Sequence, residues 1–236
     1  MAADTDTVAL ARGLLRAARS ATLATVSAGQ PFASMVTPAT APDLSPLLLL
    51  SSLAEHTRHL AADPSCALLV AGTPGSANPQ TTPRVTLTGI ARSLPDPALK
   101  ARWLARHPYA AFYAGFADFS LWRVAIGGAL LVAGFGRAAR LRPADLAPDP
   151  AAVARVAAAE ADIIAEYNAK EGGALARLAG GAGRWRIAAV DVDGCDLAPS
   201  EPDQGPVRRV AFSRPAGSAE DVRGELIHLL GEVGPR

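Results

Sequence analysis

The stretch LLLLSSLAEHTRHLAADPSCALLV, residues 47–70, contains the pattern that decides the fold. The leucine run before Ser51 and the apolar run from Cys66 predict two buried strands, because short aliphatic runs bounded by turn residues are typical of strands. Ser52 and Glu55 have the S-x-x-E spacing of a capping box, which predicts that the helix between the strands starts at Ser52. We therefore expect strand, helix and strand in this order.

The start of this helix has the chemistry of an anion site. Free backbone N–H groups and the positive end of the helix dipole favour negative charge there. His56 and Thr57 lie in the first two turns, where side chains lean back toward the same end. One interpretation is a phosphate site, and the other is that Ser52 only caps the helix while His56 faces solvent.

The composition is that of a globular protein. Of 236 residues, 50% are hydrophobic and 19% are charged, and this length allows one large domain or two smaller ones. The formal net charge is +1, from 23 basic and 22 acidic residues, and the basic residues are scattered along the chain. This balance argues against a nucleic-acid partner.

Several classes of protein are disfavoured by missing motifs. The N-terminus has no basic region typical of a secretory signal, and the longest nearly apolar run, 124–136, is too short to span a bilayer. Two cysteines exclude a disulfide framework, and the histidines show no H-E-x-x-H spacing, so we expect no metal site. The expected location is cytoplasmic, without a membrane partner.

The rest of the first 142 residues is predicted to contain further antiparallel strands. Residues 5–19 have the periodicity of an amphipathic helix, and Gly89 indicates a bulge. Gly127 and Gly128 have the chemistry of a two-residue hairpin turn. The predicted strands cover residues 21–27, 32–39, 84–94, 118–126 and 129–136. Consecutive antiparallel strands of this kind favour a barrel.

A proline-dense segment, PADLAPDP at 143–150, marks the predicted domain boundary. Beyond it, the pattern predicts a small α+β unit with helices over 150–168, 172–179 and 218–232 and strands over 185–192 and 207–212. The predicted domains are residues 1–142 and 150–236.

Two arginines and a tryptophan in the strands allow alternative roles. Arg84 and Arg123 either point to solvent, as strand arginines usually do, or neutralise an anionic ligand inside a barrel. Trp122 either packs in the core or stacks on a flat ligand or a second subunit.

Together, these segments resemble the pyridoxamine 5′-phosphate oxidase-like FMN-binding split barrels. The resemblance rests on residues 47–70, on DFSLWRVAI at 118–126, and on the L-A-x-H-T-R and G-F-G-x-A motifs, which are similar to those of the haem-utilisation branch. It implies a six-stranded antiparallel FMN-binding split barrel with peripheral helices. It also implies that 150–236 form the C-terminal α+β domain of that branch.

The resemblance further implies a homodimer with FMN between its subunits. The strand that contains residues 34–36 would line the flavin, and the strand end at 51–52 would lie beside the ribityl phosphate. His56 and Thr57 would take the place of a basic pair that binds the phosphate. The cofactor-binding residues implied in this way are Ser34, Met35, Val36, Ser51, Ser52, His56, Thr57, Arg84 and Trp122.

The function implied is FMN binding with flavin-dependent redox chemistry on a small-molecule substrate. No residue stands out as a catalytic acid or base, and neither haem oxygenase nor pyridoxamine phosphate oxidase activity is carried over. The alternatives are a haem-binding or haem-utilisation protein without flavin redox activity, and a structural dimer module.

Overall fold

A computed structural model describes residues 4–134, 136–170, 172–201 and 205–232. The chain divides into two compact units, which are described separately. The first contains Met1–Trp103 and Tyr113–Ala147, and the second contains Leu104–Phe112 and Pro148–Arg236. The segment 104–112 therefore belongs to the second unit.

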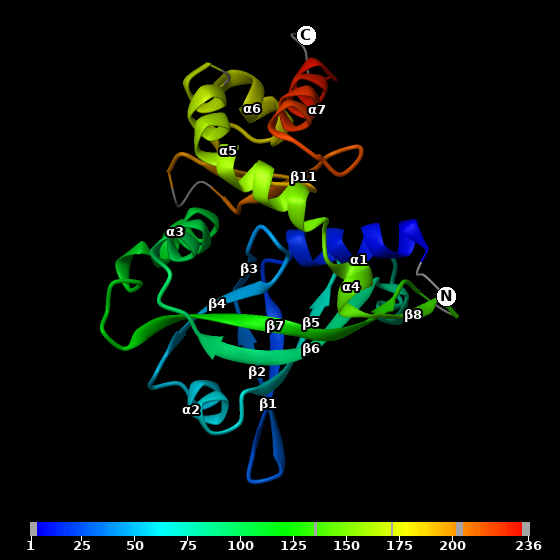
Figure 1. Cartoon of the computed structure of the whole chain (residues 1–236), viewed down its shortest axis with the longest axis vertical. Helices are drawn as coiled ribbons and strands as arrows, with labels where there is room; N and C mark the ends of the chain where they lie inside the picture. Colours follow the sequence, from blue (N-terminus) through cyan, green and yellow to red (C-terminus); the bar gives the residue numbers. More distant parts are fainter. Residues whose placement is uncertain (1–3, 135, 171, 202–204, 233–236) are drawn as a thin grey trace. The chain divides into compact units, whose positions relative to one another are not determined.

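The first unit is built on one antiparallel sheet (Figure 1). Its strands are β1 (Ala21–Ser27), β2 (Gln30–Val36), β3 (Pro38–Thr40), β4 (Pro46–Ser51), β5 (Ser65–Ala71), β6 (Arg84–Ser93), β7 (Phe119–Val132) and β8 (Ala138–Leu141). The order is β2-β1-β5-β6-β7-β4-β3, with β8 pairing beside β7. The predicted count of six strands is wrong, because seven strands follow this path and β8 adds an eighth.

The two ends of this path belong to one continuous segment of chain. Strand β2 pairs with β1, β3 pairs with β4, and Thr37 alone separates β2 from β3. Pro38 is the first residue of β3, a position where a missing N–H is tolerated. Because residues 30–40 supply both edges, the sheet curls around its core, as expected for a split barrel.

The predicted hairpin at Gly127 and Gly128 is wrong, since β7 runs unbroken through both. Gly89 pairs with Ile126 and Thr88 pairs with Gly128, so Gly127 is the extra residue of a bulge, as predicted at Gly89. A Cβ on Gly89 would lie 2.3 Å from the carbonyl oxygen of Ala125, which leaves room for glycine alone. The glycines therefore bend a long strand.

Inward-facing aliphatic side chains fill the barrel. Alternate residues of the strands, such as Leu23, Leu68 and Leu87, are fully buried. The helices of this part of the chain are α1 (Thr5–Ala17), α2 (Glu55–Ala62), α3 (Pro97–Arg106) and α4 (Pro143–Leu146), with short 3₁₀ turns at Pro79–Thr81 and Pro108–Phe112. Helix α1 contributes Ala11 and Leu15 to the same core.

A buried arginine attaches α1 to the turn between β3 and β4. Arg16 is 1% exposed, and its guanidinium donates to the carbonyl oxygens of Ala41 and Pro42, each at 2.8 Å, and to Thr40 Oγ1 at 3.0 Å. Within this turn, Leu44 has a φ of 76° and is fully buried in the core. The arginine bonds therefore hold a backbone conformation that a leucine rarely adopts.

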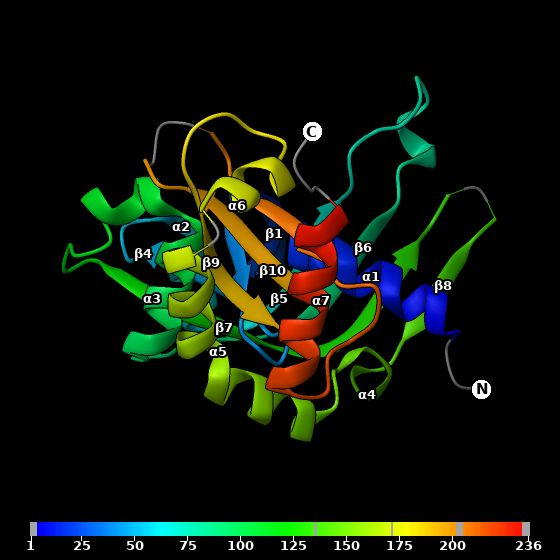
Figure 2. The ribbon, with the colours of Figure 1, turned by 90° about the horizontal axis from the view of Figure 1, so that it is seen from above.

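The second unit packs helices on a small sheet (Figures 1 and 2). Its helices are α5 (Pro150–Lys170), α6 (Gly172–Leu178) and α7 (Ala219–Glu232), and its strands, in the order β11-β10-β9, are β9 (Trp185–Asp191), β10 (Gly194–Pro199) and β11 (Arg208–Ala211). The predicted helices and two of the strands are present, whereas β10 is an additional strand. Arg209 forms a buried ion pair with Asp191, at 2.6 Å.

Among the described residues, no helix combines the length and apolarity needed to cross a membrane.

We predict that Arg16→Met lowers the free energy of unfolding by about 2–4 kcal/mol, because two carbonyl groups lose charge-assisted bonds at a buried position. Chemical denaturation measures the change. Arg19→Met is the matched control, since Arg19 lies two residues after the end of α1 and is exposed. Equal unfolding midpoints for the two variants would contradict the anchoring role of Arg16.

Candidate functional site

The turn between β4 and α2 is held by a residue far away in the sequence. Ser51 Oγ donates to the carboxylate of Asp118 at 2.5 Å and accepts from the backbone N–H of Leu53 at 3.1 Å. The backbone N–H of Ser52 donates to the carbonyl oxygen of Asp118 at 2.8 Å. The Ser51 hydroxyl is thus engaged within the chain.

The predicted capping box is wrong. Helix α2 begins at Glu55, its N-cap is Ala54, and no side chain caps it. In a capping box the Glu55 side chain would accept from the backbone N–H of Ser52, but this N–H donates to the carbonyl oxygen of Asp118 instead, and Ser52 is exposed.

Helix α2 packs against β1 and β2 through His59 (Figure 1). His59 Nδ1 lies 3.0 Å from Thr25 Oγ1 in a buried contact, and the ring meets Phe32 edge-on with centroids 5.2 Å apart. On the other side of the ring, Nε2 lies 3.4 Å from Glu55 Oε1. Thr25 and Phe32 are paired across the two strands, so a single imidazole joins the helix to both.

Two predicted residues next to this contact have buried hydroxyls without partners. Thr57 Oγ1 on α2 and Ser34 Oγ on β2 make no hydrogen bond within the described part of the chain. Leaving a buried hydroxyl unpaired costs free energy, and a functional role is one explanation for such a group. Each of the two hydroxyls is therefore a candidate partner for a polar atom of a ligand.

Strand β2 presents its predicted residues to opposite faces. Val36 is buried in the core, and Ser34 shares its face because the two are separated by one residue. Met35 lies between them on the outer face and is 80% exposed. The three matched residues therefore do not line one surface within a single chain.

His56 is half-buried near the start of α2. Burial lowers the pKa of its imidazole below the ordinary value of 6.5, and the nearby positive charge of a protonated His59 lowers it further. The free protein at neutral pH therefore holds this side chain in its uncharged form.

The structure places Trp122 and Arg84 far apart. Trp122 is part of the core, and its indole N–H donates to Ser120 Oγ at 3.0 Å. Arg84 begins β6 and donates to the carbonyl oxygens of Gln80 and Thr82, whereas Ser93 at the end of β6 pairs with Trp122. Nine residues of strand span about 30 Å, so Arg84 does not lie beside Trp122 within one chain.

Arg123, considered above as a possible counter-charge, is bound to acceptors of its own chain. Its guanidinium donates to the carboxylate of Asp43 and to Ser45 Oγ. Arg123 therefore stabilises the turn between β3 and β4.

Sequence reasoning did not include Asp118, Thr25 and His59 among the site residues. Asp118 opens the DFSL motif, which signalled its importance but not its bond to Ser51. The Thr25–His59 contact joins residues 34 positions apart and carries no local sequence signal.

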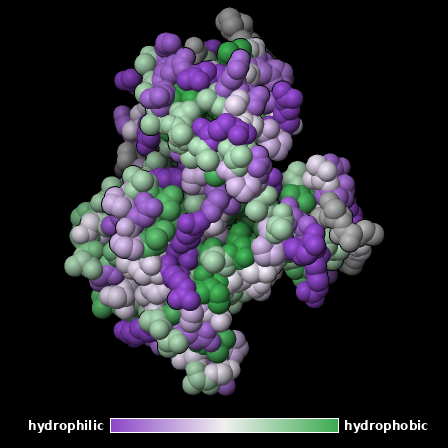
Figure 3. All heavy atoms as spheres, in the orientation of Figure 1, coloured by the Kyte–Doolittle hydropathy of each residue, from purple (hydrophilic) through white to green (hydrophobic). Residues whose placement is uncertain are grey.

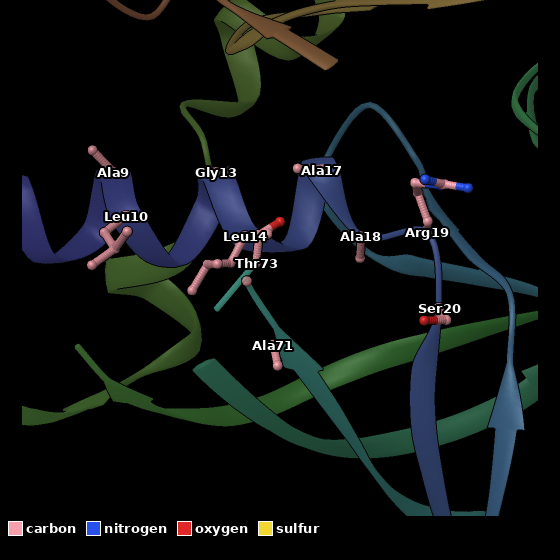
Figure 4. A pocket seen from close by; sticks show the side chains of 11 residues that line it. Ala9, Leu10, Gly13, Leu14, Ala17, Ala18, Arg19, Ser20, Ala71 and Thr73 are labelled. Atoms are coloured by element: carbon pink, nitrogen blue, oxygen red, sulfur yellow. The ribbon is translucent and has the colours of Figure 1, made fainter. Parts of the chain in front are cut away.

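A surface groove of about 560 Å³ lies elsewhere, between α1 and the end of β5 (Figure 4). Small and aliphatic residues of the helix, including Gly13 and Leu14, face Ala71 and Thr73 across it. None of the nine predicted site residues lines this groove. In the described part of the chain, no three His, Cys, Asp or Glu side chains gather in a way that would hold a metal ion.

The curled antiparallel sheet with α2 at one end defines a split-barrel protein. The sequence model of the pyridoxamine 5′-phosphate oxidase family matches residues 8–133, more than half of the chain, and the chain belongs to this family.

Similar structures and sequences include proteins named for haem. The protein Atu2129 from Agrobacterium tumefaciens, of unknown function, is 30% identical, with a TM-score of 0.77 over 98% of this chain and 96% of that one. The heme binding protein from Mycobacterium smegmatis is 26% identical, with a TM-score of 0.58 over 98% of both chains. The chloroplastic non-canonical heme oxygenase HOZ of Arabidopsis thaliana is 42% identical over 99 residues, which cover 41% of this chain and 30% of that protein.

We predict that the pKa of His56 lies below 6.5 and rises when His59 is replaced by Asn, because the substitution removes a neighbouring positive charge. An NMR titration of the imidazole signals measures both values. An unchanged His56 pKa in His59→Asn would show that the two rings do not interact.

Proposed function

We propose that the protein binds FMN and carries out flavin-dependent redox chemistry as a homodimer. The observation that carries this proposal is the pair of buried, unpartnered hydroxyls of Ser34 and Thr57 on β2 and α2. Both belong to the residues that the family resemblance assigns to the cofactor. A ligand with several hydrogen-bonding groups fits such a site.

In this proposal the phosphate binds at the start of α2. Thr57 donates its hydroxyl, His56 offers an imidazole, and the first N–H groups of the helix add donors. Ser51 and Ser52 form the adjoining turn, which Asp118 holds in place. Ser34 meets the flavin or its ribityl chain from β2, with Val36 beside it.

When bound, FMN supplies hydride or single-electron transfer through its isoalloxazine ring. The residues of this chain orient the ring and exclude water from it. Trp122 covers part of the site from the core side in this proposal. No acid or base is assigned, so the substrate class remains a small molecule that exchanges electrons with a flavin.

The second copy in this proposal covers the outer face of β2, β1 and β5. Met35 pairs with Thr22, which in turn pairs with Leu69, so these three side chains form one row across the sheet. Met35 is 80% and Leu69 39% exposed. Figure 3 shows further hydrophobic residues at the surface on the face of the unit that is turned to the viewer. Arg84 would then reach the flavin from the partner.

We expect the purified protein to bind FMN and Thr57→Val to weaken binding about tenfold, because the phosphate loses one hydrogen bond in a buried setting. Quenching of flavin fluorescence measures the dissociation constant. The control is Thr7→Val, which removes an exposed hydroxyl of α1.

A protein that is colourless as purified and binds no added FMN would overturn the proposal. If the protein binds FMN and Thr57→Val leaves the affinity unchanged, the cofactor proposal stands, but the proposed position of the phosphate beside Thr57 is wrong.

We also expect FMN affinity to fall as the pH rises. The phosphate favours protonated His56, so its pKa is higher in the complex than in the free protein, where it is below 6.5. Affinity is therefore greatest below the free pKa, declines between the two pKa values and is constant above the second. Each unit of separation changes the dissociation constant about tenfold.

The control for this measurement is His56→Gln, in which the FMN phosphate still titrates but the imidazole is gone. Parallel pH profiles for the variant and the wild type would contradict a role for His56.

The second candidate is haem binding without flavin redox activity. It is favoured by the similarity to the heme binding protein from Mycobacterium smegmatis over nearly the whole chain. In this candidate, residues 150–236 would act as the haem-utilisation domain. Haem titration distinguishes the two: a tight Soret shift in a protein that takes up no FMN supports haem binding.

A further inference from the structure

We propose that His59 is the positioning residue of the phosphate site: it fixes α2 against β1 and β2 and so holds Thr57 and His56 where they meet the ligand. This inference rests on the proposed FMN function. His59 itself makes no contact with the ligand in this scheme.

The first argument is that His59 makes a contact from each side of its ring. Nδ1 meets Thr25 Oγ1 on β1 at 3.0 Å, and Nε2 lies 3.4 Å from Glu55 on its own helix. Phe32 of β2 packs edge-on against the ring. The two ring nitrogen atoms therefore face partners on different elements, one on β1 and one on α2 itself.

The second argument is the shortness of the helix. Helix α2 has eight residues and no side-chain cap, and isolated helices of this length are unstable in water. Its position must come from packing, and His59 and Leu60 are its buried residues beside Thr57. Leu60 gives apolar burial, which is not directional, whereas the His59 bond fixes the rotation of the helix.

The third argument is the spacing of the residues. His56 precedes His59 by three positions and Thr57 by two, so a small rotation of the helix about its axis moves both side chains relative to β2. The unpartnered hydroxyl of Ser34 is on β2, two residues from Phe32. A ligand spanning Ser34 and Thr57 therefore needs the register between helix and strand that His59 sets.

A double-mutant cycle on FMN affinity tests this inference. Thr25→Val removes the hydroxyl with nearly unchanged shape, His59→Leu removes the imidazole, and the third variant combines them. We expect each single change to weaken FMN binding about tenfold, and the double change to weaken it no further, because both remove the same bond.

His59→Asn serves as the rescue variant, since its amide has a hydrogen-bonding atom near the place of Nδ1. We expect it to recover most of the affinity lost in His59→Leu. Chemical denaturation of each variant checks that it is folded, and Arg58→Ala is the control on the exposed side of the same helix.

Wild-type protein that fails to bind FMN would overturn both the proposed function and this inference. Wild-type binding with folded single variants of unchanged affinity would overturn the inference alone. Additive losses in the double variant would also overturn it, because they would show that Thr25 and His59 act independently.

Discussion

The closure of the barrel by residues 30–40 is the constraint on which the rest of the first unit depends. This segment pairs with β1 along β2 and with β4 along β3, so it fixes the distance between two strands that are far apart in the sheet order. Strand β2 carries Ser34, and β4 ends at Ser51 beside the turn into α2. One continuous stretch of backbone thus places both sides of the candidate site.

Closure also explains why the turn after β3 is held so firmly. The chain must reverse between β3 and β4 in a few residues, and it does so with Leu44 at a positive φ. Arg16 from α1 and Arg123 from β7 both bond to this turn. Both guanidinium groups donate charge-assisted hydrogen bonds to backbone or carboxylate oxygens of the turn, and these bonds compensate the strain of its backbone.

The strand–helix–strand order of residues 47–70 and the helices of the second unit were predictable because their patterns are local. The capping box failed for the opposite reason: Ser52 is bound by Asp118, 66 residues away, and no spacing rule contains that contact. The glycines at 127–128 fit a hairpin turn and a bulge equally well in sequence. Pairing with β6 decides for the bulge.

The candidate site was predictable only in part. Residue types near the start of α2 indicate an anion site, which stays a prediction, and Thr57 and Ser34 have buried hydroxyls without partners in the described part of the chain. The bond from Ser51 to Asp118 and the distance between Arg84 and Trp122 follow from the sheet register. Register depends on pairing across the whole sheet, which one sequence does not reveal.

Fixed positive charge is scarce where the phosphate is proposed to bind. Arg16, Arg84 and Arg123 are bonded to acceptors of their own chain, and Arg58 on α2 pairs with Glu55 at 2.9 Å. Apart from the titratable His56, the proposed site therefore relies on neutral donors, whose hydrogen bonds depend strongly on distance and angle, unlike the longer-ranged attraction of a charge. A site of this kind tolerates little displacement of its helix, and this makes the docking of α2 on β1 and β2 as important as the residues that meet the ligand.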